Sequence, residues 1–276
     1  MANLDTYDVI SVVGIPIYVV FLICAVFLSI KHGFAQSSGW RYLIVLALAR
    51  IVGFSFRLAI MSDPSDISLW IGWMVLNSLG LGPLILVLLG LLSRVFESIT
   101  RQDHVVLTAT HRRLIQLLVV VAIVVTVVGG TQSDFVVRNG AIEVDYATAC
   151  DVGVGLMIAV VVLLCLETLV AFRNQGYVVK DEHRILLGVV ASLPFVIVRL
   201  LYSCVSVFAG VNTNVWVYLG MGVLMEMIVV FMLEALGFTL DKTPREPEDD
   251  CDPELLAQEA GQQQQQQQQQ QRYIGQ

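Results

Sequence analysis

Seven stretches of the chain are almost entirely apolar, and a short polar segment separates each from the next. Each stretch is long enough for an α-helix to cross a bilayer, which takes about 20 residues. The pattern therefore predicts an all-α bundle of seven transmembrane helices. The predicted spans are residues 8–30, 42–61, 69–95, 114–130, 149–172, 185–209 and 215–240. In the polar link at 131–148, alternating apolar and polar residues around Asn139-Gly140 predict a short β-hairpin.

The composition supports a membrane protein. Hydrophobic residues make up 57% of the chain and charged residues 14%, whereas soluble domains carry about 25% charged residues. The last 36 residues differ: they hold eight acidic against three basic residues, and ten consecutive glutamines at Gln262–Gln271. Such a segment has too little apolar surface to fold. We therefore predict a membrane domain at residues 1–240 and a disordered acidic and polyglutamine tail at 241–276, for which the sequence indicates no cytosolic partner.

The charges of the links predict the orientation. With seven spans, the links after the first, third and fifth lie on the side of the C-terminus. That side holds nine Lys and Arg residues, against Arg138 alone on the other side: Lys31, Arg41, Arg94, Arg101, Arg112, Arg113, Arg173, Lys180 and Arg184. Because basic residues concentrate in cytosolic links, we expect the N-terminus outside and the C-terminus in the cytosol. The pattern fits both a plasma membrane and an endomembrane.

The second span contains two arginines, Arg50 and Arg57, and the sixth contains Arg199. Arg50 and Arg57 are seven residues apart, so they lie near one face of a helix, about two turns from each other. A charge at membrane depth costs about 2.5–3.5 kcal/mol on insertion scales. It is therefore expected to face protein or water and to have a partner.

Three glutamates in the predicted spans can provide such partners. At about 1.5 Å of rise per residue, Glu226 lies near the midplane, and Glu167 and Glu234 lie near the inner surface. Matching depths predicts that Arg57 and Arg199 pair with Glu226, with Asp151 as a further partner.

The same depths predict that Arg50 pairs with Glu167 or Glu234. The charges either line a polar cavity or only hold the helices together, and we weigh these interpretations about equally. Glu167 and Glu234 also have the alternative of extending to the membrane surface.

Two spans contain helix-breaking residues at mid-depth. In the third, Asn77-Ser78-Leu79-Gly80-Leu81-Gly82-Pro83 predicts a break, because Pro83 lacks a backbone donor and glycine lowers the cost of a kink. Ser192-Leu193-Pro194 predicts a similar feature in the sixth span. Broken helices bind substrate in transporters, although close packing is the simpler explanation for either site alone. Asn77, beside the break, is the residue that we single out as a candidate ligand.

Several familiar functions find no support in the sequence. The seventh span has no lysine for a retinal Schiff base, and the third ends in Ser93-Arg94-Val95-Phe96 rather than the acid-Arg-Tyr motif of common G-protein-coupled receptors. No basic surface with interleaved aromatic residues indicates nucleic-acid binding. The spans show no metal-ligand spacing, and we expect no metal and no cofactor.

Local strings resemble a known family. Lys31-His32-Gly33-Phe34, Ser37-Ser38-Gly39-Trp40 and Arg50-Ile51-Val52-Gly53 are followed by Leu89-Gly90-Leu91-Leu92-Ser93-Arg94 and Gly129-Gly130-Thr131. Together they resemble an uncharacterised family of heptahelical integral membrane proteins from filamentous fungi, over the region from the first to the seventh span. The resemblance implies no catalytic residues. In its seven spans and orientation the chain is also similar to the fungal lipid-translocating exporters, a likeness of general fold only.

These observations favour a protein that binds or translocates a lipid-like or other hydrophobic small molecule. Arg57, Arg199, Glu226 and Asn77 are the expected binding residues, with Arg50, Glu167 and Glu234 completing an intramembrane charge network. In this hypothesis the arginines hold an anionic head group, and Glu226 balances charge or carries a proton. Besides this molecule, we expect membrane lipids as partners, and a cytosolic partner of the tail stays unknown.

Two alternatives remain open. One is a membrane enzyme similar to terpene cyclases, with Glu226 as the proton donor. The other is a seven-helix receptor that couples through Arg94–Arg113 and the tail.

Overall fold

The structure is a computed structural model, and it describes residues 5–32, 38–100, 109–138, 141–177, 180–208 and 214–240. The chain divides into two units, Met1–Asp241 and Lys242–Gln276. All of the described residues belong to the first unit. The predicted tail, residues 241–276, lies outside the described residues and stays a prediction.

Within the described residues, seven helical segments are long and apolar enough to cross a membrane. Five of them are single helices: α1 (Thr6–His32), α2 (Ser38–Ile60), α5 (Ala109–Gln132), α6 (Thr148–Arg173) and α7 (Lys180–Phe208). The third span comprises α3 (Ile67–Leu79) and α4 (Leu81–Thr100). The seventh comprises α8 (Val215–Val217), a π-helix (Tyr218–Leu224) and α9 (Met225–Thr239). The protein is thus a multi-pass helical membrane protein, as predicted.

The link between α5 and α6 contains the predicted hairpin. Strand β1 (Asp134–Arg138) pairs antiparallel with β2 (Ala141–Asp145), and Arg138 lies opposite Ala141. The pairing agrees with the predicted hairpin, and the Asn139-Gly140 pair on which that prediction rests lies outside the described residues.

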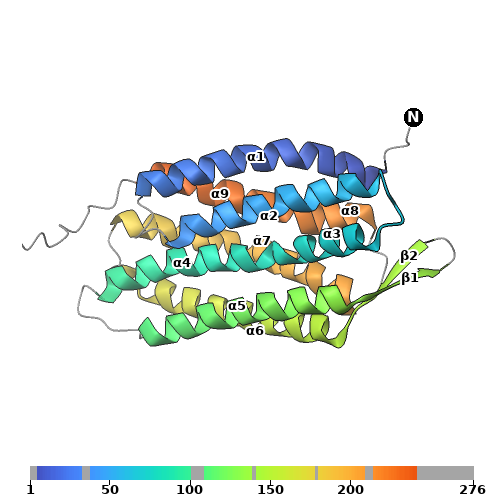
Figure 1. Cartoon of the computed structure of the whole chain (residues 1–276). Coiled ribbons are helices and arrows are strands. Elements are labelled where there is room, and N and C mark those ends of the chain that lie inside the picture. Colours follow the sequence, from blue (N-terminus) through green and yellow to red (C-terminus); the bar gives the residue numbers. More distant parts are fainter. Residues whose placement is uncertain are drawn as a thin grey trace, which may run out of the picture. The chain divides into compact units, whose positions relative to one another are not determined.

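Helix α4 is the centre of the bundle. It contacts α2, α5, α6, α7 and α9, and in Figure 1 it runs between α2 and α5 with α7 behind it. Every residue from Leu81 to Leu92 is buried. Because leucine, isoleucine and valine dominate this stretch on all sides of the helix, α4 can be enclosed by protein all around. The main hydrophobic core forms about it.

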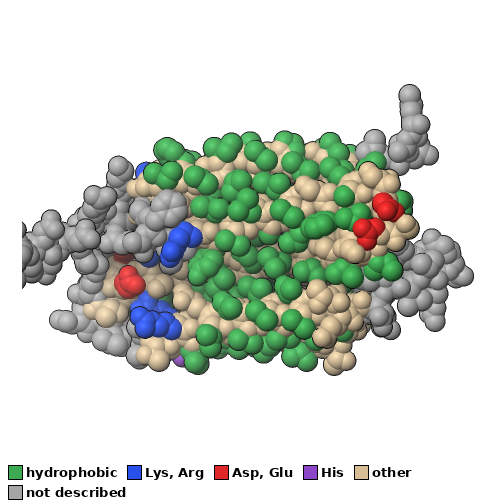
Figure 2. All heavy atoms as spheres, viewed as in Figure 1, with side chains coloured by type: hydrophobic (Ala, Val, Ile, Leu, Met, Phe, Trp, Pro, Cys, Tyr) green, Lys and Arg blue, Asp and Glu red, His purple; other side chains and the backbone are tan. Residues whose placement is uncertain are grey.

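Helices α1 and α5 are at the periphery. Apolar side chains of α5 such as Leu114, Leu117 and Val124 are more than half exposed, as expected for the lipid-facing helix that the fourth span predicts. Figure 2 shows an almost continuous apolar surface along the helices of one face, with Lys and Arg at the end where α4 ends and α5 begins. This distribution agrees with the predicted orientation, which stays a prediction from the charges.

Glycines allow α5 and α6 to approach closely. A Cβ added to Gly129 of α5 would lie 2.4 Å from the backbone nitrogen of Cys150, and one added to Gly153 of α6 would lie 2.9 Å from Cα of Thr126. Small residues at such contacts let helix backbones come close enough for van der Waals packing to hold the helices together in lipid.

The sixth span does not break at its proline. Helix α7 continues from Lys180 to Phe208 with Pro194 inside it, so the expected similarity to the break in the third span is wrong. The Ser192 hydroxyl donates to the Gly188 carbonyl oxygen at 2.8 Å, which is the usual way in which serine is accommodated in an apolar helix.

Two glycines of α6 provide a direct test of this packing. Gly153→Ala places a methyl group against the Thr126 backbone, and we expect it to destabilise the protein by about 1–3 kcal/mol. Gly155 has no atom within 4 Å of an added Cβ, so Gly155→Ala is expected to be neutral or to stabilise the helix by up to about 1 kcal/mol. Unfolding midpoints in mild detergent measure both, and equal losses would contradict the close approach.

Candidate functional site

The third span is interrupted at Gly80, within the Asn77–Pro83 segment that predicts a break. Gly80 itself has helical dihedrals, φ −55° and ψ −32°, so its role is not conformational. A Cβ at this position would lie 2.7 Å from both Nη2 of Arg50 and Oε2 of Glu226. The glycine is therefore needed for space, because it lets a buried ion pair lie directly against the helix backbone.

Arg50 of α2 and Glu226 of α9 form this ion pair. Nε of Arg50 donates to Oε1 of Glu226 at 2.5 Å, and Nη2 donates to Oε2. The residues are 2% and 0% exposed, so neither water nor lipid reaches them. A bidentate pair of this kind combines charge attraction with a fixed planar geometry. The prediction that Arg50 pairs with Glu167 or Glu234 is wrong.

Two further side chains complete the surroundings of Glu226. The hydroxyl of buried Tyr18 in α1 donates to Oε1 at 3.0 Å, and Nε of Arg199 in α7 lies 3.6 Å from Oε2. The predicted pairing of Arg199 with Glu226 is thus confirmed. The ring of Tyr202 packs against the Arg199 guanidinium, with its centre 5.2 Å from the guanidinium carbon.

Asn77 binds both arginines. Its side-chain oxygen accepts from Nη1 of Arg50 at 2.8 Å, and its backbone carbonyl accepts from Nη2 of Arg199 at 2.8 Å. The carbonyl is available because Asn77 lies in the last turn of α3, where carbonyl groups lose their partners within the helix. The break in the third span therefore supplies an acceptor for a buried cation. We call Arg50, Arg199, Glu226 and Asn77 the charged cluster.

The charged cluster contains two positive charges and one negative charge. No other acidic side chain among the described residues forms an ion pair with Arg50 or Arg199. The end of α3 adds partial negative charge, but α4 begins after a single residue and its N-terminus adds a similar partial positive charge. These contributions nearly cancel, so the cluster has an excess of one positive charge in the middle of the bundle.

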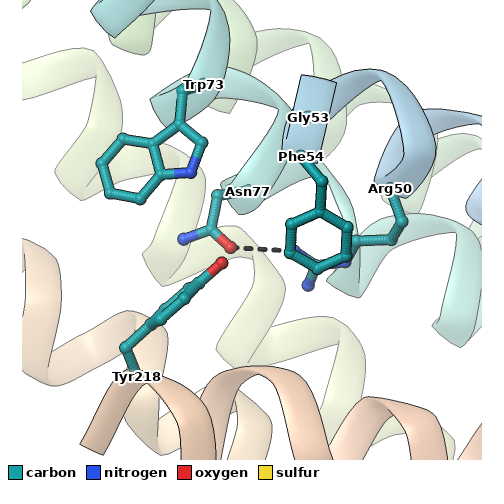
Figure 3. Close-up of a pocket in the computed structure, with 6 residues that line it drawn as sticks. All are labelled: Arg50, Gly53, Phe54, Trp73, Asn77 and Tyr218. Carbon is teal, nitrogen blue, oxygen red and sulfur yellow. Dashed lines mark hydrogen bonds between the residues drawn. The ribbon is translucent and has the colours of Figure 1, made fainter. Parts of the chain in front are cut away.

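A narrow pocket lies beside the charged cluster and shares Arg50 and Asn77 with it. It is lined by Arg50, Gly53, Phe54, Trp73, Asn77 and Tyr218. Figure 3 shows the Asn77 oxygen directed to Arg50, its amide nitrogen on the opposite side, and the Tyr218 hydroxyl facing the amide. The pocket has about 160 Å³ of space between and in front of these atoms, yet no sphere of water size fits in it.

Arg57 is separate from the charged cluster. Nε of Arg57 donates to Asp8 at 3.0 Å, and Nη2 donates to Asp5 at 3.1 Å. The prediction that Arg57 pairs with Glu226 is therefore wrong. Matching depths missed these partners because Asp5 and Asp8 lie at the outer end of the first span and were not counted among the acids within the spans. Arg57 lies toward the outer end of its own span, and this is the signal that would have identified them.

Aromatic rings surround the Arg57 guanidinium. Its central carbon is 5.1 Å from the ring centre of Tyr7, 5.3 Å from that of Trp70 and 5.4 Å from that of Trp73. Such contacts are favourable because the face of an aromatic ring is negative. Trp73 also lines the pocket, so Arg57 and its partners lie at the predicted outer end of the same aromatic wall.

The other predicted acids do not join the site. Glu167 and Glu234 are 5% and 4% exposed, and Oε1 of each is buried with no hydrogen-bond partner among the described residues. Asp151 forms no ion pair with the arginines of the described spans. Neither Glu167 nor Glu234 pairs with Arg50, which binds Glu226 instead, and their place in a wider charge network stays a prediction.

Tyr18, Tyr202 and Tyr218 are the tyrosines that the sequence weakly indicates as lining a cavity, and each contacts the cluster or the pocket. Tyr218 begins the π-helix, whose backbone hydrogen bonds reach one residue farther than those of an α-helix, and Glu226 is the second residue after that segment. π-Helical segments often occur at functional sites. Gly220 and Gly222 were the available signal for this irregularity. Within the described residues, no group of three His, Cys, Asp or Glu is placed to hold a metal ion.

A family model described as "Domain of unknown function (DUF7702)" matches residues 4–243. The chain belongs to this family. The matched region includes every residue of the charged cluster and the pocket, as well as Arg57 with Asp5 and Asp8. No curated protein and no solved structure matches the chain. The expected resemblance to an uncharacterised family is thereby confirmed, while the fungal source and the likeness to lipid exporters stay expectations.

The charge balance of the cluster predicts different roles for two glutamates of α9. Glu226→Gln leaves two buried arginines without a counter-charge, and we expect a loss of about 3–5 kcal/mol in unfolding free energy. Glu234→Gln removes a carboxylate that has no ion pair in the described structure, so it is expected to be neutral or stabilising. Denaturant titration of the purified variants tests this, and a tolerated Glu226→Gln would contradict the pairing.

The two partners of Arg57 differ in burial and therefore in expected importance. The Asp8 side chain is 6% exposed and that of Asp5 is 58% exposed. Asp8→Asn weakens a buried charged hydrogen bond and should cost about 1.5–3 kcal/mol, whereas Asp5→Asn should cost at most about 1 kcal/mol. The loss for Asp5→Asn should also shrink at high salt. Thermal unfolding at two salt concentrations distinguishes the two cases.

Proposed function

We propose that this protein binds and translocates a lipid-like or other hydrophobic small molecule, with the charged cluster as the polar part of its binding site. The observation that carries the proposal is the broken third span. Its interruption lies beside two buried arginines and a pocket with aromatic walls, in the middle of a seven-helix membrane bundle. Discontinuous helices at mid-membrane are the usual place where transporters bind their substrates.

The pocket supports a partly apolar ligand. Phe54, Trp73 and Tyr218 supply aromatic surface, while Arg50 and Asn77 supply polar groups at one end. Ligand sites are typically apolar pockets with a few convergent polar groups. Arg57, one of the residues expected to bind the ligand, lies instead with Asp5 and Asp8 beyond Trp73, where it closes the outer end of the aromatic wall.

A role of Glu226 as a proton-donating acid is less well supported. Both of its oxygens accept hydrogen bonds from Arg50, and Tyr18 donates a third. Such bonds favour the ionised carboxylate. A proton donor would have to be neutral, so the arrangement suits a counter-ion for the arginines better than a cyclase-type acid.

Reconstitution into phosphatidylcholine vesicles tests the function. The full chain is reconstituted with trace amounts of fluorescent phosphatidylcholine or phosphatidylserine, and external dithionite reports how fast probe from the inner leaflet becomes accessible. Gly53 lines the pocket, and a Cβ there would lie 3.3 Å from Cβ of Leu76 on α3, so Gly53→Leu should crowd this wall of the pocket and slow translocation at least about fivefold. Gly155→Leu is the matched control, since nothing lies within 4 Å of its Cβ position.

The vesicle experiment has a second readout for binding without translocation. Hydrophobic molecules that co-purify with the protein are extracted and identified by mass spectrometry. We expect a retained molecule in the wild type and in Gly155→Leu, and its loss in Gly53→Leu variants that still elute as a single species. If no probe moves and nothing is retained, the proposal is wrong.

A further inference from the structure

The groups that the pocket offers to a ligand are hydrogen-bond donors. The side-chain oxygen of Asn77 already accepts from Arg50, and because a guanidinium only donates, the oxygen must face Arg50. The amide NH₂ is therefore turned away from Arg50, as Figure 3 shows. The Tyr218 hydroxyl also lies beside this amide (Figure 3), and among the described residues neither the Asn77 nitrogen nor the Tyr218 hydroxyl donates a hydrogen bond. Arg50, which can only donate hydrogen bonds, also lines the pocket.

The charge of the surroundings has the matching sign. The charged cluster holds two arginines and one glutamate, and no other described acid forms an ion pair with either arginine. Arg57, about two turns away on α2, has two carboxylates of its own, so the positive excess is local to the cluster. Nε of Arg199, which is 1% exposed, forms no hydrogen bond and is only within ion-pair distance of Glu226, at 3.6 Å. A buried site with unused donors and one excess positive charge is complementary to a ligand group with one negative charge.

The pocket is narrow. Its space of about 160 Å³ includes the open space in front of it, and no sphere of water size fits inside. A carboxylate is the smallest of the common anionic lipid head groups, so it requires the smallest opening. The rings of Trp73 and Tyr218, whose centres are 6.2 Å apart in an edge-to-face arrangement, have to separate to admit the ligand.

We infer that this pocket recognises the anionic head of a fatty-acid-like amphiphile, with the Asn77 amide, the Tyr218 hydroxyl and Arg50 as donors and the aromatic wall against its chain. This inference rests on the proposed function and names the class of its substrate. The ligand neutralises the excess charge of the cluster, which is the reason that the protein tolerates two arginines for one glutamate at membrane depth.

Ligands with the same ten-carbon chain and different heads test the inference. The full-length protein in neutral phosphatidylcholine nanodiscs is titrated calorimetrically with decanoate, decanol, decyltrimethylammonium, decyl phosphate and acetate. Decanoate is expected to bind about tenfold or more tighter than decanol and decyltrimethylammonium. Acetate should bind weakly because it lacks the chain. Tighter binding of decyl phosphate than of decanoate would overturn the choice of a carboxylate-sized head.

Asn77→Asp is the most discriminating variant. Aspartate keeps the acceptor for Arg50, replaces the amide donor, and supplies the negative charge that the cluster lacks. We expect the unfolding temperature to stay the same or rise, while affinity for decanoate falls about tenfold or more and that for decanol is unchanged. A destabilised Asn77→Asp protein, or one that binds decanoate normally, would show that the cluster has no excess charge available to a ligand.

Two tyrosine variants separate recognition from packing. Tyr218→Phe removes a hydroxyl that faces the pocket, and should weaken decanoate binding about tenfold. Tyr42→Phe makes the same change in a ring that packs against the main hydrophobic core and does not line the pocket, and should leave binding unchanged. Equal effects of both variants would overturn the assigned role of Tyr218. If decanol binds as tightly as decanoate, only this inference fails, whereas if no ten-carbon ligand binds, the proposed function fails as well.

Discussion

Burial of two arginines against a single glutamate is the constraint on which the rest of the bundle depends. Arg50, Arg199 and Glu226 come from three helices, and each is almost completely buried. An unpaired charge at this depth costs several kcal/mol, so the three helices must meet with the side chains in register. The residues around them serve that requirement. Gly80 leaves room for the ion pair, Asn77 adds hydrogen-bond acceptors, and the Tyr18 hydroxyl donates a further hydrogen bond to the Glu226 carboxylate.

The broken third span links this constraint to the architecture. Below the break, α4 is apolar and buried from Leu81 to Leu92, and above it α3 carries the neighbouring rings of Trp70 and Trp73 toward the predicted outer surface. One irregular helix thereby provides both a dry core and a polar site. The seventh span has its own irregularity, the π-helix that precedes Glu226, on the opposite side of the same site. Irregular backbone in two spans thus meets where the charges are, as expected if irregular backbone at membrane depth is tolerated only inside protein.

The outer end of the bundle balances its charge differently. Arg57 has two carboxylates and three aromatic rings as neighbours, so its charge is more than balanced, whereas the charged cluster has more positive than negative groups. The contrast is informative because both sites lie on α2, seven residues apart. The chain is able to pair an arginine fully, and the incomplete balance deeper in the bundle is the feature that a ligand would complete.

The seven spans, the hairpin and the break in the third span were all readable from the sequence. Each depends on local properties: the length of an apolar run, an Asn-Gly pair between alternating residues, or a proline among glycines. The depth of each charged residue was also readable, and it correctly paired Arg199 with Glu226. Depth alone could not choose among partners, because it says nothing about which helices are neighbours or where on a helix a side chain points. The tertiary structure therefore decided that Arg50 meets Glu226, that Arg57 meets Asp8, and that Tyr218 faces Asn77.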